Sequence, residues 1–162
     1  MSRVHILPLV CVYVLLAGCN QSSDVIPHKV DRLILYSLEC DFDENAVPED
    51  AEMLHGYLVL GKTEVDSAAS RTEILDAVRT DIANGSSIAN CFEPHHAIRI
   101  GHDDRTSDVV ICYKCRGYEC SENGKLKTTS YPMDVHSREL LNRVLTSDGI
   151  TLSPAATEEL KQ

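Results

Sequence analysis

The sequence predicts a small α+β domain in which a mainly antiparallel sheet of four to five strands carries two helices on one face. Several short runs are rich in Val, Ile, Leu and Tyr, which favour strands. Two further segments repeat their apolar residues at helical spacing. The links between successive strand-like runs are short, and short links favour antiparallel pairing.

The first two strands are expected at residues 33–39 (LILYSLE) and 55–65 (HGYLVLGKTEV), on either side of an acidic loop. Within that loop, positions 1, 3, 5 and 12 of a calcium-binding loop are occupied by Asp41, Asp43, Asn45 and Glu52. Alanine stands where such a loop needs glycine, and a proline interrupts it. A solvated acidic loop is therefore expected in preference to a calcium site.

The first helix is expected over residues 68–84. Ser70 and Glu73 have the spacing of a capping box, and Asp66 and Ser67 are alternative caps. A glycine directly after residue 84 is a helix stop signal. The apolar stripe expected to face the sheet consists of Ile74, Leu75, Val78 and Ile82.

Three strands and a second helix are expected in the rest of the domain. Residues 96–100 alternate like a strand, and residues 108–118 (DVVICYKCRGY) give the strongest strand signal. Residues 125–131 follow an Asn-Gly hairpin signal. The second helix is expected over residues 137–147, and residues 155–162 are expected to form a flexible tail.

The N-terminus predicts export. Residues 1–18 place one arginine before an apolar run that has the length of a signal peptide and is too short to span a membrane. The run ends in Leu-Ala-Gly-Cys at residues 16–19, which resembles the lipobox of bacterial lipoproteins. By this resemblance, the chain is cleaved before Cys19, whose sulfur carries a diacylglycerol, and residues 19–31 form a lipidated tether.

The mature chain is expected to be a single acidic domain, at residues 32–154. Removal of 18 of the 162 residues leaves 144, and because Arg3 is the only charge lost, 14 Lys and Arg face 25 Asp and Glu. So acidic a chain is a poor partner for nucleic acid. The lipid predicts attachment to a membrane of the cell envelope, facing the periplasm or the exterior, and Asn20 after the lipidated cysteine favours the outer membrane over the inner one.

Five cysteines remain in the mature body: Cys40, Cys91, Cys112, Cys115 and Cys120. Because thiols meet oxidants outside the cytosol, one or two disulfides are expected, with at least one sulfur left over. In a continuous strand, Cys112 and Cys115 would point to opposite faces about 10 Å apart, too far for a direct bond. A bridge between Cys40 and Cys120, each at the end of a predicted strand, is geometrically natural, but the sequence leaves the pairing open.

The alternative is a zinc site built from Cys91, His95 or His96, Cys112 and Cys115. The ligand types are right, but only the pair Cys112 and Cys115 has standard spacing. A proline between Cys91 and His95 rules out a regular helix there. His96 shares its strand parity with two isoleucines and is more simply explained as a core histidine.

A thiol-dependent enzyme is a weaker alternative. A redox Cys-x-x-Cys usually opens a helix, whereas a strand-like run precedes Cys112. A nucleophile pair of Cys91 and His96 lacks a recognisable third group or oxyanion motif. The sequence therefore assigns no catalytic residue.

Three motifs occur in the order HGYLVLGKTEV, CFEPHHAIRI and DVVICYKC. Together they resemble a family of small exported or lipid-anchored proteins, frequent in planctomycetes and related bacteria, with the patterns FHGYxVLGK, CFxPRHxI and VICFxC. Most of residues 33–154 share this resemblance, but His95 stands where the pattern has arginine and Leu54 replaces an aromatic residue. The resemblance implies a single exported domain and supplies no catalytic residue. The expected protein is a lipid-anchored envelope protein that acts as a binding or structural module.

Overall fold

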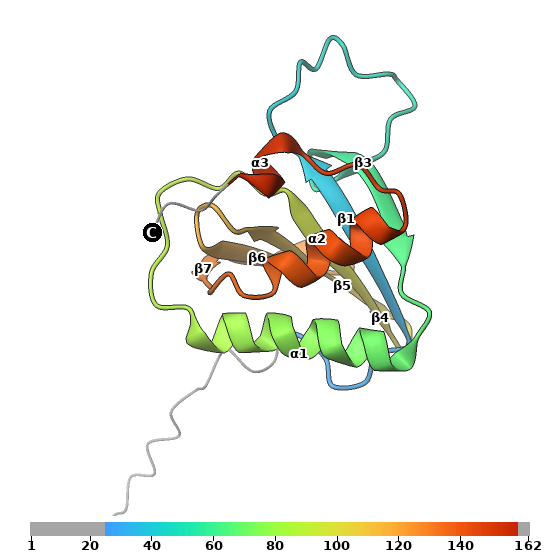
Figure 1. Cartoon of the computed structure of the whole chain (residues 1–162), viewed down its shortest axis with the longest axis vertical. Helices are drawn as coiled ribbons and strands as arrows, with labels where there is room; N and C mark the ends of the chain where they lie inside the picture. Colours follow the sequence, from blue (N-terminus) through green and yellow to red (C-terminus); the bar gives the residue numbers. More distant parts are fainter. Residues whose placement is uncertain (1–24, 159–162) are drawn as a thin grey trace, which may run out of the picture.

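The structure, a computed structural model, describes residues 25–158, apart from the side chains of residues 128–130. It confirms the α+β class and the antiparallel sheet (Figure 1). Among the described residues there are seven strands and three helices, more than the four to five strands and two helices predicted. The predicted signal peptide and the lipidation site at Cys19 lie outside the described residues.

The strands are β1 (Arg32–Glu39), β2 (Met53–Leu54), β3 (Tyr57–Glu64), β4 (His96–His102), β5 (Arg105–Cys112), β6 (Gly117–Glu122) and β7 (Lys125–Pro132). They pair antiparallel in the order β2-β3-β1-β4-β5-β6-β7. β1 therefore lies between two strands that come from different parts of the chain. Both of its faces are buried, since Leu33 and Leu35 pack beneath the helices whereas Ile34 and Tyr36 pack on the opposite face. This explains its continuous apolar sequence.

Helices α1 (Ala68–Asn84) and α2 (Arg138–Ser147) cover one face of the sheet (Figure 1). α1 has the bounds predicted from the sequence, and Ser67 is its cap, because its hydroxyl accepts a hydrogen bond from the N–H of Ser70. The predicted stripe is buried as expected, and it consists of Ile74, Leu75, Val78 and Ile82.

A buried carboxylate joins the two helices. Asp81 of α1 is fully buried and accepts hydrogen bonds from the backbone N–H groups of His136 and Ser137, at 3.1 and 2.7 Å. It thereby satisfies donors at the start of α2 that the helix itself cannot pair. The Ser137 hydroxyl also bonds Asp81 and lies 2.7 Å from the hydroxyl of Tyr113. This network fixes α2 over the turn that follows β5.

The prediction of one continuous strand over residues 108–118 is wrong. β5 ends at Cys112, and β6 begins at Gly117 after a turn. Arg116 in that turn has a φ of 54°, a left-handed conformation that no strand contains. The turn lets Tyr113 enter the core and Cys115 bond to Cys91.

The packed region extends past the predicted domain at both ends. Ile26, within the expected tether, is 2% exposed and belongs to the main core. α3 (Pro154–Thr157) begins at the last residue of the predicted domain, extends into the expected tail and buries Ala156. The guanidinium of Arg138 holds α3 by donating to the carbonyl oxygen of Ala156, at 3.0 and 2.7 Å, and to that of Glu158.

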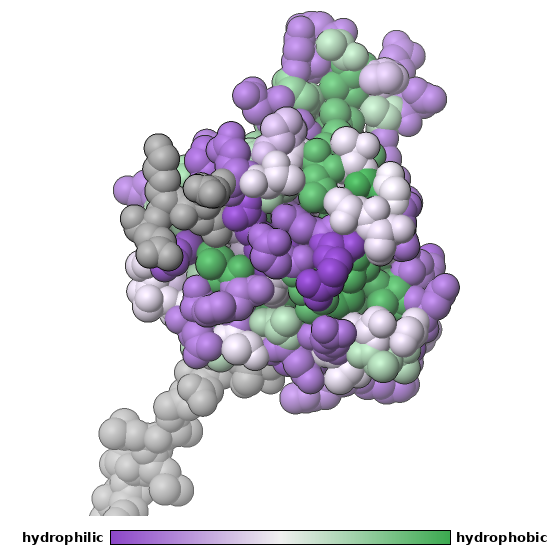
Figure 2. Space-filling model, viewed as in Figure 1, coloured by the Kyte–Doolittle hydropathy of each residue, from purple (hydrophilic) through white to green (hydrophobic). Residues whose placement is uncertain are grey.

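The acidic loop between β1 and β2 projects from one end of the sheet, at the top of Figure 1. Hydrophilic side chains gather on its outer edge (Figure 2). Asp43 accepts hydrogen bonds from the backbone and side chain of Asn45, and Glu52 pairs with Lys62 of β3 at 2.7 Å. These carboxylates therefore have partners within the protein.

Among residues 25–158, no helix has the length and apolar character needed to cross a membrane.

Candidate metal site

The pairing of β1 with its two neighbours builds a site at the end of β1. On one side, Ser37 pairs with His96 of β4, and the N–H of Leu38 donates to the carbonyl of His95 at 2.9 Å. His95 therefore lies beside the last residues of β1. On the other side, the pairing of Glu39 with Leu58 of β3 brings Tyr57 next to the same end.

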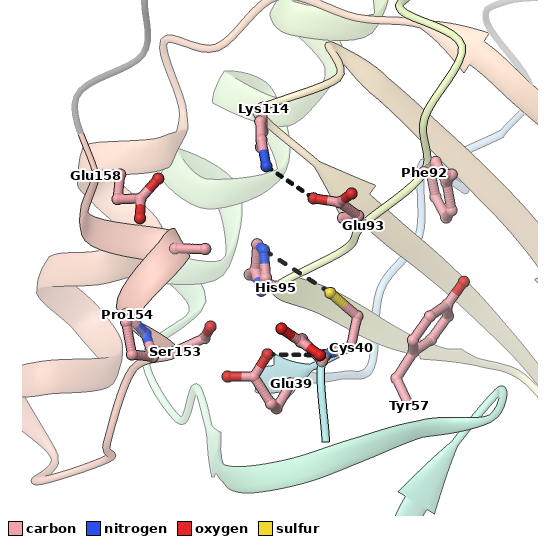
Figure 3. Close-up of a pocket in the computed structure, with 12 residues that line it drawn as sticks. Glu39, Cys40, Tyr57, Phe92, Glu93, His95, Lys114, Ser153, Pro154 and Glu158 are labelled. Carbon is pink, nitrogen blue, oxygen red and sulfur yellow. Dashed lines mark hydrogen bonds and ion pairs between the residues drawn. The ribbon is translucent and has the colours of Figure 1, made fainter. Parts of the chain in front are cut away.

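Three potential metal ligands meet there. Cys40 Sγ lies 4.0 Å from His95 Nε2, and the ligand atoms of Glu39, Cys40 and His95 all lie within 4.8 Å of one another (Figure 3). His95 is 5% exposed, whereas the other two side chains are half-buried. Thiolate sulfur, imidazole nitrogen and carboxylate oxygen are the donors that zinc takes in proteins. This cluster, Glu39–Cys40–His95, could hold a metal ion.

The cluster faces a pocket of about 820 Å³. Tyr57 and Phe92 lie on one side of it, and Ser153 and Pro154 at the start of α3 lie on the other (Figure 3). The salt bridge between Lys114 and Glu93, 2.8 Å long, forms a further part of the wall. The pocket is thus open to small molecules and is closed on one side by α3.

The electrostatics favour a neutral thiol at Cys40 and a neutral imidazole at His95. Burial raises the pKa of the Cys40 thiol, and the carboxylates of Glu39 and Glu93 raise it further. Burial lowers the pKa of His95, although Glu39 opposes this shift. A neutral imidazole is the form that binds metals, and the negative charges around the sulfur favour a cation.

The same shifts disfavour Cys40 as a nucleophile, since the thiolate is the reactive species and a raised pKa makes it scarce. The pair of Cys91 and His96 considered from the sequence is not available either. The sulfur of Cys91 is in a disulfide, and the imidazole of His96 is held by Asn142, with 2.7 Å between Nε2 and Oδ1.

One disulfide is present among the described residues, between Cys91 and Cys115, with their Cα atoms 5.9 Å apart. It ties the segment before β4 to the turn after β5. Cys40 and Cys112 are free thiols. The sequence leaves the pairing open, and a bridge from Cys40 to Cys120 is not formed here, because β4 and β5 separate β1 from β6 and hold their backbones roughly 14 Å apart.

The zinc ligands predicted from the sequence are distributed over different environments. Cys91 and Cys115 are bonded to each other, and Cys112 Sγ accepts the N–H of Cys115 at 3.2 Å. His96 is 1% exposed and points to α2. Of the predicted set, only His95 joins the cluster with Glu39 and Cys40. From the sequence, Cys40 is a candidate only for a disulfide, and Glu39 is not a candidate for any site. No local pattern connects them to His95, because 55 residues separate Cys40 from His95.

A second polar network lies on the sheet face opposite the helices. Asp108 is 3% exposed and accepts two hydrogen bonds from Arg99 and one from His55 Nε2 at 2.7 Å. Burial raises the pKa of Asp108, but the bonds from Arg99 and His55 outweigh it and leave the pKa below its usual value. Ser121 Oγ lies 3.2 Å from the same ring nitrogen of His55. A Ser–His–Asp relay needs both ring nitrogens, so this network is structural.

Comparisons with models of protein families, with curated proteins and with solved structures each found no match to this chain. The resemblance to the planctomycete-type family therefore stays a prediction from the three motifs.

Proposed function

We propose that this protein is a lipid-anchored protein of the bacterial cell envelope whose domain binds a zinc ion at the Glu39–Cys40–His95 cluster. One observation carries the proposal: three donors of the types that zinc prefers converge to within 4.8 Å on the wall of a pocket. A sulfur and a nitrogen donor together favour zinc over calcium or magnesium, which take oxygen ligands.

The surroundings support a cation at this position. The pocket is lined by the carboxylates of Glu39, Asp41, Glu93 and Glu158, against the single ammonium of Lys114. His95 is held by its backbone, since its N–H donates to the carbonyl of Ile111 and its carbonyl accepts from Leu38. This places the imidazole in the pocket before any ion binds.

Replacing one ligand tests the zinc site. The acylated mature protein would be purified in detergent, stripped of metal with a chelator and then titrated with zinc, and we expect it to bind one zinc ion per chain. His95→Gln should weaken zinc binding by at least about 100-fold, because it removes one of three protein ligands. The matched control is His28→Gln, since His28 is an exposed histidine outside the pocket. Equal zinc affinity in wild type and His95→Gln, measured by competition with a chromophoric chelator, would contradict the proposal.

The anchor is tested by mass and by acyl labelling. The lipobox motivates the expectation that native protein lacks residues 1–18 and incorporates an alkyne-tagged palmitate. Cys19→Ser should abolish the label and leave the signal peptide in place. The control Cys40→Ser, which deletes a free thiol of the folded domain, should change neither the label nor the cleavage. An unlabelled wild-type protein with an intact N-terminus would overturn the lipid assignment.

A further inference from the structure

The Glu39–Cys40–His95 cluster supplies three metal ligands, whereas zinc in proteins is usually four-coordinate. Among residues 25–158, no other His, Cys, Asp or Glu side chain completes this cluster. Resting on the proposed zinc site, we propose that the fourth coordination position is open to the pocket and binds a neutral, imidazole-type nitrogen carried by a small molecule with an apolar ring.

The pocket provides the room for such a ligand. Its volume of about 820 Å³ falls within the roughly 300–1,000 Å³ typical of sites for small molecules. A structural zinc site is closed by four protein ligands and does not adjoin an open pocket through a free coordination position. The chamber begins at the cluster itself, because Glu39, Cys40 and His95 are all part of its lining (Figure 3).

Two aromatic side chains provide an apolar wall beside the metal position. Tyr57 and Phe92 lie together on the side of Cys40 that faces away from α3 (Figure 3). Both are partly buried and pack against the core of Tyr36 and Leu38, which keeps their rings in place. Aromatic rings hold flat apolar groups in offset or edge-to-face contact. A ligand with a ring attached to its donor group fits this wall.

The charges around the cluster select a neutral donor. The two positive charges of a zinc ion are matched by the Glu39 carboxylate and the Cys40 thiolate. Nearby, Glu93 is paired with Lys114, which leaves Asp41 and Glu158 as further negative charges in the lining. An anionic ligand, such as a carboxylate or phosphate, would meet a net negative pocket. A neutral nitrogen avoids this repulsion.

An unpaired hydroxyl supports the imidazole class in particular. Ser153, in the pocket lining, is 1% exposed, and its Oγ has no hydrogen-bond partner among the described residues. Buried hydroxyls without a partner are unusual, and this one can accept a hydrogen bond. An imidazole that binds the metal through one nitrogen presents an N–H on the other. That N–H has Ser153 and the pocket carboxylates as acceptors.

Cobalt substitution tests the inference, because the visible spectrum of Co²⁺ reports its coordination number and ligands. Full-length protein loaded with Co²⁺ would be titrated separately with imidazole, 4-phenylimidazole and acetate. We expect both imidazoles to change the spectrum, and 4-phenylimidazole to bind at least about tenfold more tightly because its phenyl ring leaves water. Acetate should bind more weakly than either. The blocked dipeptide acetyl-His-Phe-amide, in a further titration, distinguishes a peptide source of the same chemistry from a free heteroaromatic compound.

A matched pair of variants localises the effect. Phe92→Ala should remove the advantage of 4-phenylimidazole over imidazole and leave imidazole binding unchanged. Leu126→Ala, which deletes a 57% exposed apolar side chain outside this pocket, should keep the advantage.

The outcomes distinguish failure of this inference from failure of the zinc site. Bound cobalt whose spectrum responds to neither imidazole means a closed site, which overturns this inference and leaves the zinc site standing. Failure to bind cobalt or zinc overturns both. Equal affinity for the two imidazoles in wild type, or tighter binding of acetate, overturns the proposed ligand class.

Discussion

Removing the disulfide between Cys91 and Cys115 is expected to lower the free energy of unfolding by about 3 kcal/mol. The bridge joins residues 24 positions apart and links the segment before β4 to the turn between β5 and β6. In the chain-entropy view, a crosslink over this separation removes conformations from the unfolded chain and so stabilises the fold. The segment has few other ties to that turn, chiefly the Glu93–Lys114 salt bridge and the hydrogen bond from Ala89 to Cys115.

Urea unfolding of the double variant Cys91→Ala/Cys115→Ala checks this expectation against wild type, both as full-length chains in the same detergent. Reductant provides the control, since it should lower the stability of wild type and leave the double variant unchanged. An unfolding midpoint that is equal in the two oxidised proteins would contradict a stabilising bridge. We also expect the variant to fold, because alanine keeps the fully buried position of Cys115 apolar.

Acid is expected to destabilise the domain by about 3 kcal/mol between pH 6.5 and pH 4 through the side chain of His96. The pKa of His96 is lowered to about 4, chiefly by complete burial; the bond to Asn142 opposes this shift, and the charges of His95 and Arg138 add to it. The amide of Asn142 donates to Ala156, so its oxygen accepts from His96 Nε2 and the imidazole is held neutral. The unfolded chain binds a proton on this residue below about pH 6.5, whereas the folded chain binds it only near pH 4. The stability is therefore complete above pH 6.5 and falls as the pH is lowered.

The pH dependence of urea unfolding tests this with metal-free protein. His96→Gln removes the titrating group, and its stability should change less between pH 7 and pH 4.5 than that of wild type, whatever its absolute stability. The matched control is His28→Gln, because an exposed histidine should keep the wild-type slope. If wild type and His96→Gln showed the same slope, another group would have to account for the acid sensitivity.

The sequence predicted the helices better than the turn after β5. α1 begins and ends where its cap, its apolar stripe and its terminal glycine indicate, because these signals act within a few residues of one another. The turn at residues 113–116 contains no glycine, proline or asparagine, and its tyrosine favours a strand. Core packing of Tyr113 and the bond of Cys115 to Cys91 outweigh that local preference.

The candidate site was predicted only in part. His95 was identified as a possible zinc ligand from its sequence neighbours, yet its partners in the structure come from the end of β1. Nothing in the residues around Glu39 and Cys40 indicates which later strand pairs with β1. Whether Cys40 is a free thiol depends on how the other cysteines pair, and a sequence with five cysteines does not decide the pairing.

The sequence by itself determined the α+β class, the bounds of the first helix and the expectation of a disulfide. It could do so because periodicity, caps and composition are local properties of the chain. Only the tertiary structure decided which sulfurs bond, which histidine packs against α2 and which faces the pocket. These depend on the order and register of the strands, because pairing β1 with β4 brings donors 55 residues apart into contact.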